Sequence, residues 1–263
     1  MRPLCEFPHK DLLKIKYVLT DIDDTLTKDG RLPSKSYHAL EKLNQAGFKV
    51  IPITGRPAGW CDHIARMWPV DAVVGENGAF YFVYEQSKRK IVRRYWKSKK
   101  ERTTDRKRLE KIQNKILTTV KGSALASDQA YREADLAIDY CEDVKPLPDS
   151  SVTKIMDIFL KEGAVAKISS IHVNGWFGDY DKLKMTRILL EEYFRLKDAE
   201  FMEKIVFTGD SPNDEPMFNY FKNSVGVGNI MNHANQIKNF PTWITTKNNA
   251  EGFSELADTL LSA

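Results

Sequence analysis

The chain has 263 residues, of which 42% are hydrophobic and 29% are charged, a composition typical of a soluble globular protein. The formal net charge of +4 is too small to predict a nucleic-acid partner, and no apolar run approaches the roughly 20 residues of a membrane span. Cys5, Cys61 and Cys141 lack metal-ligand spacing, and the N-terminus has no signal-peptide pattern. We therefore expect a cytoplasmic protein with neither a membrane nor a nucleic-acid partner.

The first predicted strand, residues 17–20, leads directly into an acidic segment. Its residues are apolar, aromatic or β-branched, which is typical of a buried parallel strand. Asp21 and Asp23 follow, and side chains two positions apart on an extended chain share a face, about 6–7 Å apart. Carboxylates this close need a cation or a shared proton. By itself, the pattern favours an Asx turn that closes a strand, and only the rest of the chain favours the functional interpretation.

Strands and helices then alternate. Periodicity predicts helices over residues 34–46 and 59–67, and short apolar runs predict strands over residues 50–53 and 72–74. This order favours βαβ units on a parallel sheet. The pattern resumes later in the chain, with a predicted helix over residues 181–196 and a buried strand over residues 204–208.

Residues 84–178 interrupt this order. Alternating polar and apolar residues predict an antiparallel hairpin over residues 79–96, and the stretch from 88 to 121 is rich in Lys and Arg. A helix over residues 152–162 and two short strands within 164–177 follow. We interpret the interruption as an inserted α+β domain, and the rest of the chain as one core domain, residues 1–83 and 179–263.

Each buried strand of the predicted core ends in a polar motif. The carboxyl ends of parallel strands meet at one sheet edge, where ligands bind, so these motifs are expected to lie together. The carboxylates at or near this edge are hard oxygen ligands suited to Mg²⁺, and they are Asp21, Asp23, Asp210 and Asp214. With the Thr54 hydroxyl and the Lys182 ammonium, they suit a phosphoryl group. Taken singly, Asp214 is an ordinary helix-capping acid and Lys182 an ordinary surface lysine.

Four sequence motifs resemble, in order, those of the haloacid dehalogenase-like (HAD) phosphohydrolases. They are DIDDTLT (21–27), ITGR (53–56), the lysine of DYDKLKM (179–185) and GDSPND (209–214). The insertion after the third strand, preceded by ENGA, resembles class IIB (Cof-like) members with a C2-type cap, which include sucrose-phosphate and trehalose-phosphate phosphatases and phosphomannomutases. The resemblance implies a Rossmann-like α/β core with a parallel sheet and an inserted α+β cap that selects the substrate.

The resemblance also implies roles for individual residues. Asp21 is the nucleophile that forms an aspartyl-phosphate, and Asp23 protonates the leaving alcohol and then activates water. The residues implied in phosphate binding are Thr54, Gly55, Lys182 and Asn213. Mg²⁺ is bound by Asp21, the backbone carbonyl of Asp23 and Asp210, and Asp214 orients the metal shell. The family often has glycine after its lysine, whereas Leu183 stands here, and Lys184 is a rival.

Substrate contacts are predicted in the inserted domain. His172 and Asn174 share one face of a predicted strand, and Arg132 is a third candidate. Asn77, in the core domain, is a further candidate. An ordinary cap surface with a packed His172 is the alternative. The leading hypothesis is a Mg²⁺-dependent phosphatase of small phosphorylated metabolites, in particular sugar phosphates. A phosphomutase, a phosphorylated signalling receiver and a polynucleotide phosphatase are the other hypotheses.

Overall fold

The computed structural model describes the whole chain, from Met1 to Ala263. Its largest sheet has six strands, all parallel, in the order β1-β13-β12-β11-β2-β3. The strands are β1 (Arg2–Pro3), β2 (Tyr17–Thr20), β3 (Lys49–Pro52), β11 (Ile205–Gly209), β12 (Ser224–Gly226) and β13 (Trp243–Ile244). β2 lies between β11 and β3, which is the interior position that a strand with an unbroken apolar run requires. The expected parallel α/β core is confirmed.

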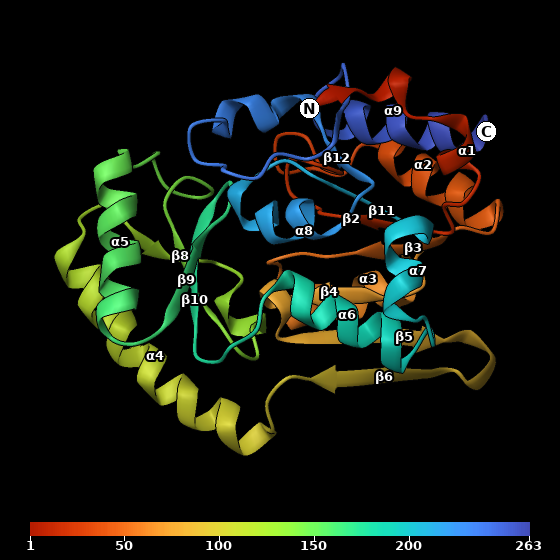
Figure 1. Ribbon diagram of the computed structural model, residues 1–263. Helices are drawn as coiled ribbons and strands as arrows, with labels where there is room; N and C mark the ends of the chain where they lie inside the picture. The colour runs from red at the N-terminus through yellow and green to blue at the C-terminus, as the bar shows by residue number, and fades with distance from the viewer.

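Helices cover both faces of this sheet (Figure 1). Successive residues of β2 point to opposite faces, so Val18 and Leu19 belong to two different hydrophobic clusters. The cluster around Val18 is covered by α1 (His9–Leu12), α2 (Ser34–Gln45), α3 (Ala58–Met67) and α9 (Asn249–Leu261). The cluster around Leu19 is covered by α6 (Lys182–Glu192), α7 (Asp198–Lys204) and α8 (Glu215–Tyr220). The core therefore has three layers, helices on either side of one sheet.

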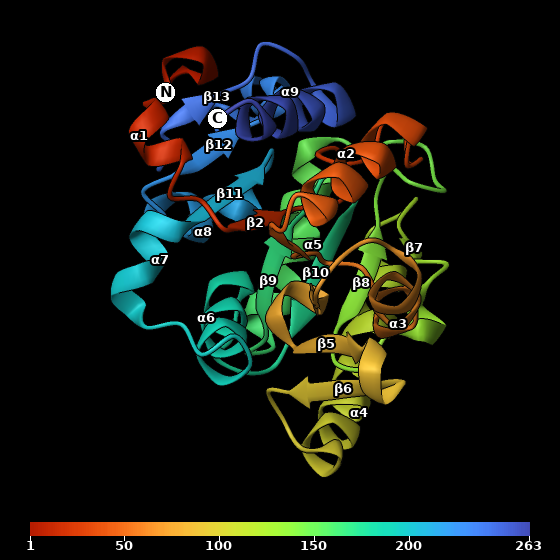
Figure 2. The same ribbon diagram turned by 90° about the vertical axis from the view of Figure 1, so that its right-hand side faces the viewer.

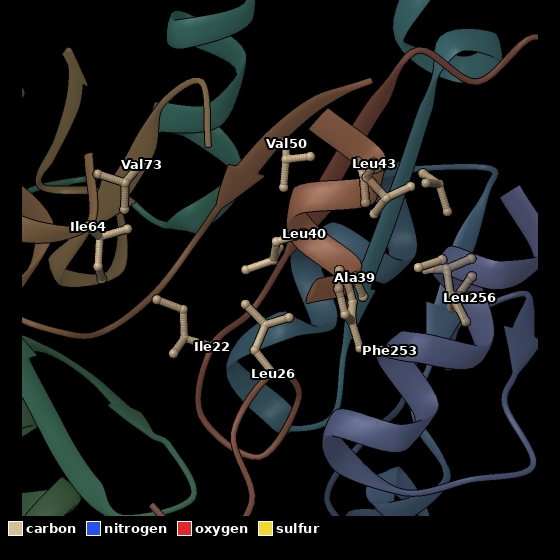
Figure 3. Packing of buried hydrophobic residues seen from close by; sticks show 14 of the residues in the cluster. Ile22, Leu26, Ala39, Leu40, Leu43, Val50, Ile64, Val73, Phe253 and Leu256 are labelled. Atoms are coloured by element: carbon tan, nitrogen blue, oxygen red, sulfur yellow. The ribbon is translucent and has the colours of Figure 1, made fainter. Parts of the chain in front are cut away.

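Figure 3 shows how the first of these clusters is filled. Leu40 and Leu43 recur on one side of α2, at the spacing that the sequence predicted, and they pack with Phe253 and Leu256 of α9. Leu40, Leu43, Phe253 and Leu256 are each 0% exposed. Burial of a side chain of this size contributes roughly 1.5–3 kcal/mol. This packing holds β2, and with it the acidic segment that follows, in a fixed place.

A second, three-stranded sheet extends the core beyond β3. It contains β4 (Val73–Gly75), β5 (Phe80–Glu85) and β6 (Lys90–Tyr95), and a parallel bridge between Ile53 and Val74 joins it to the strand before it. β5 and β6 form the antiparallel hairpin that the alternating pattern predicted. The expected domain boundary between residues 83 and 84 falls inside β5. Because β5 is bonded to β4, we propose that the hairpin belongs to the core.

The inserted domain has a sheet and a hydrophobic core of its own. Its four strands are antiparallel in the order β7-β8-β10-β9, with β7 (Ala124–Leu125), β8 (Leu136–Asp139), β9 (Val165–Ile168) and β10 (His172–Trp176). Its fourteen clustered core residues run from Leu109 to Phe177. Its helices α4 (Lys99–Thr119) and α5 (Asp149–Lys161) lie on the side of the sheet turned away from the core (Figure 1). We propose residues 98–177 as the cap.

The basic stretch lies mainly on α4, which buries only a narrow stripe of apolar residues. Several of its charges are paired with acids of the same domain: Arg102 with Glu133, Arg108 with Asp105 and Lys115 with Glu162. None of the helices combines the length and the apolar character that a membrane-spanning segment needs.

Most predicted helices have the expected bounds, but α6 ends at Glu192 rather than at residue 196. The reason is local, because Arg195 adopts a positive φ of 59° and turns the chain away.

Both chain termini lie at the end of the molecule opposite the β5–β6 hairpin (Figure 2).

Candidate active site

The end of β2 places Asp21 against a buried lysine. The Lys182 ammonium donates a hydrogen bond to Asp21 Oδ1 at 2.7 Å, and Lys182 is only 1% exposed. Lys182 is the first residue of α6, whose Met185 and Leu189 are buried, so the helical phase turns the lysine inward. The rival Lys184 instead pairs with Asp179 at the surface.

The start of α6 can come this close because Gly78 leaves room for it. Gly78 has a φ of +104°, and a Cβ on it would lie 2.0 Å from the backbone oxygen of Asp181. Asp181 caps α6 by accepting a hydrogen bond from the backbone N–H of Lys184 at 2.8 Å. The ENGA segment therefore positions the lysine through the backbone rather than through its side chains.

Three buried carboxylates gather around this lysine. Asp21, Asp210 and Asp214 each offer an oxygen within 4.8 Å of the others. Burial raises the pKa of Asp21 to about 8, although the Lys182 ammonium opposes the shift. Burial also raises the pKa of Asp210 well above its usual range, and the neighbouring carboxylates add to the rise. A single lysine thus leaves the cluster short of positive charge.

The chemistry of these donors fits a divalent cation. Hard carboxylate oxygens suit Mg²⁺, and its charge would favour the ionised forms of Asp21 and Asp210. Asp210 is held in place by hydrogen bonds from Thr25 Oγ1 at 3.1 Å and from Asn229 Nδ2 at 3.2 Å. Asn229, which sequence reasoning did not single out, therefore supports the Asp210 carboxylate.

Asp214 plays a different part in the geometry. Its Oδ1 accepts from Lys182 at 2.7 Å, and its Oδ2 accepts from the backbone N–H groups of Asp210 and Ser211. A Cβ at Gly209 would lie 2.4 Å from Asp214 Oδ2, so glycine is required for this approach. Both Asp214 oxygens are engaged, and the side chain joins Lys182 to the turn that carries Asp210. Asn213 Oδ1 lies 3.4 Å from the same ammonium.

Asp23 is bound by an arginine that the sequence motif contains but whose role sequence reasoning did not assign. Arg56 Nε donates to both oxygens of Asp23, at 2.9 and 3.1 Å. Arg56 Nη2 also donates to Glu142 Oε1 of the cap, at 2.8 Å. Its position in ITGR, directly after Thr54 and Gly55, was the available signal. Arg56 therefore connects the core acid to the cap.

The turn after β3 is closed by a hydrogen bond from the backbone to a side chain. Thr54 Oγ1 accepts from the backbone N–H of Arg56 at 3.0 Å, which closes the turn around Gly55. Asn77 lies behind this turn, because a Cβ on Gly55 would be 3.1 Å from Asn77 Nδ2. The Asn77 amide is buried and has no hydrogen-bond partner in the protein. It does not line the cavity around Asp21, so any contact to substrate would need a shift of the loop.

A small cavity of about 10 Å³ separates the strand-end residues from β10. Asp21, Asp23 and Gly55 line one side of it, and His172 and Asn174 of the cap line the other. His172 Nε2 lies 2.9 Å from Glu142 Oε2, and Asn174 Nδ2 donates to Asp135 Oδ2 at 2.9 Å. Val173 between them is buried in the core of the cap. His172 and Asn174 thus lie on one face of β10 and across the small cavity from Asp21.

Glu142 carries a strongly shifted pKa. Burial alone would raise it, but the hydrogen bonds from His172 and Arg56 outweigh burial and lower the pKa of Glu142 to about 2. The carboxylate therefore stays ionised and holds the two domains together at neutral pH.

Arg132 is already fully occupied. Its guanidinium pairs with Asp128 and Asp135 and donates to the backbone oxygen of Gly55 at 2.9 Å. The side chain is 0% exposed. Every guanidinium nitrogen has a partner within the protein, so Arg132 connects the cap to the turn at Gly55. The side chain also lines the small cavity that contains Asp21, and its predicted contact with substrate stays a prediction.

Glu76 makes a second set of hydrogen bonds between the core and the cap. It accepts hydrogen bonds from the backbone N–H groups of Glu133, Ala134 and Asp135, at 2.6–3.1 Å, and from Ala58 at the start of α3. Burial and the nearby Asp135 raise the pKa of Glu76 to about 7.

Comparison with known proteins agrees with this geometry. The sequence profile of the haloacid dehalogenase-like hydrolases matches residues 18–174 and 190–256. No curated protein matches the sequence. The fold is similar to that of a protein from Thermoplasma acidophilum, with a TM-score of 0.71, 18% identity, and coverage of 94% of this chain and 98% of the other.

Two further solved structures with the same fold have a stated activity. One is the sucrose-phosphatase from Synechocystis sp., in complex with sucrose and phosphate, with a TM-score of 0.64, 14% identity, and coverage of 94% and 98%. The other is a sugar phosphatase of HAD subclass IIB, with a TM-score of 0.60, 15% identity, and coverage of 93% and 98%. At these identities the likeness shows the fold.

Proposed function

The chain belongs to the haloacid dehalogenase-like hydrolase family, and from this premise we propose that it is a Mg²⁺-dependent phosphatase that acts on phosphate monoesters of small metabolites through an aspartyl-phosphate. The observation that carries the proposal is the placement of Asp21. Its buried carboxylate lies at a strand end, beside Lys182 and Asp210, with Asp23 two residues further on. This is the set of groups that two successive displacements at phosphorus require.

In the first displacement, an Asp21 oxygen attacks phosphorus and the bond from phosphorus to the ester oxygen breaks. Asp23 gives its proton to that oxygen, so the alcohol leaves neutral. In the second displacement, Asp23 takes a proton from water, whose oxygen attacks the phosphorus of the aspartyl-phosphate. Phosphate leaves, and the Asp21 carboxylate is regenerated. One carboxyl group acting in both directions balances the protons.

The surrounding residues hold the reacting groups in place. Lys182, Thr54 and the backbone of Gly55 are suited to bind the phosphoryl oxygens, and Asn213 stands next to the lysine. Asp214 orients Lys182, and Arg56 fixes the Asp23 carboxylate beside the nucleophile. Asp21, Asp210 and the backbone carbonyl of Asp23 would hold Mg²⁺. The ion would neutralise the repulsion between the carboxylate and the phosphate.

Sugar phosphates are the first substrates to test, since structural neighbours are named as sugar phosphatases. We also propose that the protein is cytoplasmic, because its three cysteines form no disulfide.

The direct test is phosphate release from a panel of phosphorylated metabolites with Mg²⁺, for the wild type and Asp21→Asn. We expect release by the wild type and none by the variant. An isomerised sugar phosphate without free phosphate would identify a mutase instead. No release from any substrate would refute the phosphatase.

A further inference from the structure

A second and much larger cavity adjoins the catalytic residues. It has a volume of about 490 Å³ and lies between the loop that follows β2, helix α3 and Tyr131 of the cap. Asp23 and Arg56 line both this cavity and the small cavity that contains Asp21. They form the wall that the two spaces share. An ester oxygen that receives the Asp23 proton therefore lies at the junction of the two.

The two cavities differ in the room that they leave beside Asp23 for the organic part of a substrate. About 10 Å³ is close to the space of one water molecule, so the small cavity has no room for an alcohol larger than a few atoms. The larger volume of about 490 Å³ is within the range of pockets that hold small-molecule ligands. With the cap in the position seen here, an alcohol attached to a phosphate at Asp21 has room in the larger cavity.

The lining of the larger cavity is mostly aromatic and aliphatic. Trp60, Trp68 and Tyr131 contribute rings, and Ile22 and Leu32 contribute aliphatic side chains. Trp60 and Tyr131 are 43% and 60% exposed, so their rings are accessible to a ligand. The Arg56 guanidinium lies 4.5 Å from the Trp60 ring centroid, which places a π-face next to the junction.

The cavity has few charged side chains in its lining. Asp23 and Arg56 are its only side chains of fixed charge, and they are bonded to each other. Thr27 Oγ1 is used within its own loop, where it accepts from the backbone N–H of Asp24 at 2.9 Å. A flat apolar ring would gain contact with the aromatic side chains of this lining.

We propose that this aromatic cavity binds the alcohol part of the substrate, and that the preferred substrates are phosphate monoesters whose alcohol carries a planar aromatic ring. The proposal rests on the phosphatase function above and narrows its substrate class. The phosphoryl group binds at Asp21, the ester oxygen lies beside Asp23, and the ring stacks near Trp60 and Tyr131. The freed alcohol leaves through the cavity with the proton from Asp23.

The test compares three phosphate donors with the Mg²⁺-loaded wild type. 1-Naphthylmethyl phosphate and glucose 6-phosphate are both esters of primary alcohols, so they differ mainly in the group that the cavity would hold. Acetyl phosphate is too small to reach it. We expect kcat/KM for 1-naphthylmethyl phosphate to exceed that for glucose 6-phosphate at least about tenfold, the effect of one good aromatic contact. Equal values, or a preference for glucose 6-phosphate, would overturn the proposal.

Variants locate the effect in the cavity. Trp60→Ala and Tyr131→Ala should each lower the ratio of kcat/KM for 1-naphthylmethyl phosphate to that for acetyl phosphate by about tenfold. Trp60→Phe should restore most of the loss. Phe240→Ala is the matched control, because Phe240 is 38% exposed and does not line the cavity, and its ratio should stay at the wild-type value. An unchanged ratio in both alanine variants would refute the site.

The outcomes separate the two proposals. Hydrolysis of acetyl phosphate without a preference for the aromatic ester would overturn the cavity assignment alone. Failure of the wild type to release phosphate from all three donors would overturn the phosphatase function and the cavity assignment together.

Discussion

The core and the cap both bury charged side chains, but they balance them differently. Around Asp21 the core gathers three carboxylates against one lysine, and burial raises the pKa values of Asp21 and Asp210. In the cap and along its contact with the core, Arg132 has a partner at every nitrogen, and the pKa of Glu142 is lowered to about 2. The three carboxylates against one lysine suit an added cation, whereas the paired charges of Arg132 and Glu142 join the cap to the core.

The largest effect should come from the unbalanced cluster itself. Asp21→Asn removes the proposed nucleophile. Because an amide cannot form an aspartyl-phosphate, phosphate release should fall by about 10³-fold or more. Phosphate release with Mg²⁺ measures it, and circular dichroism checks that the fold persists. Retention of a tenth of wild-type activity would remove Asp21 from the nucleophile role.

Metal removal tests whether the carboxylates around Asp21 need a divalent cation for activity. EDTA should abolish phosphate release by the wild type. Asp210→Ala should raise the Mg²⁺ concentration needed for half-maximal activity by at least about tenfold. Ca²⁺ should replace Mg²⁺ poorly, because it accepts more ligands in looser geometry. Activity titrated against each metal is the measurement, and full activity in EDTA would exclude the ion from the reaction.

The two lysines of α6 form a matched pair. Lys182→Ala should lower kcat/KM by about 10²-fold, because it removes the buried ammonium from Asp21 and Asp214. Lys184→Ala should change it less than about twofold, since that side chain pairs only with the exposed Asp179. Similar losses in the two variants would contradict the assignment of Lys182.

The smallest expected effect is on stability and concerns Glu142, which contacts Arg56 and His172. The lowered pKa of Glu142 means that its ionised form stabilises the fold, fully above its unfolded pKa of about 4.5 and progressively less as the pH falls toward 2. Glu142→Gln should therefore lower the free energy of unfolding at pH 7 by about 1–2 kcal/mol, allowing for partial solvent screening.

Urea unfolding of both proteins between pH 7 and pH 3 measures this difference. The gap between wild type and variant should narrow as the pH falls below about 4.5. A gap that does not change with pH would show that the Glu142 charge does not hold the cap to the core.

The sequence alone determined the parts of the site that depend on short segments of chain. An apolar strand followed at once by Asp21 and Asp23 has its meaning within a few residues, and so has the helical phase that turns Lys182 inward. The rule that parallel strands end at one edge was then enough to bring Asp210 to Asp21. The family match and the parallel core agree with these inferences.

Only the tertiary structure decided which groups are already used. Arg132 in the sequence is a potential clamp, but its neighbours Asp128, Asp135 and the Gly55 carbonyl take up its donors. The β5–β6 hairpin was recognisable, yet its attachment to β4 depends on a strand partner that local alternation does not specify. Hydrogen-bond partners and strand neighbours come from distant segments, and their choice depends on which polar groups are buried together, which no local pattern records.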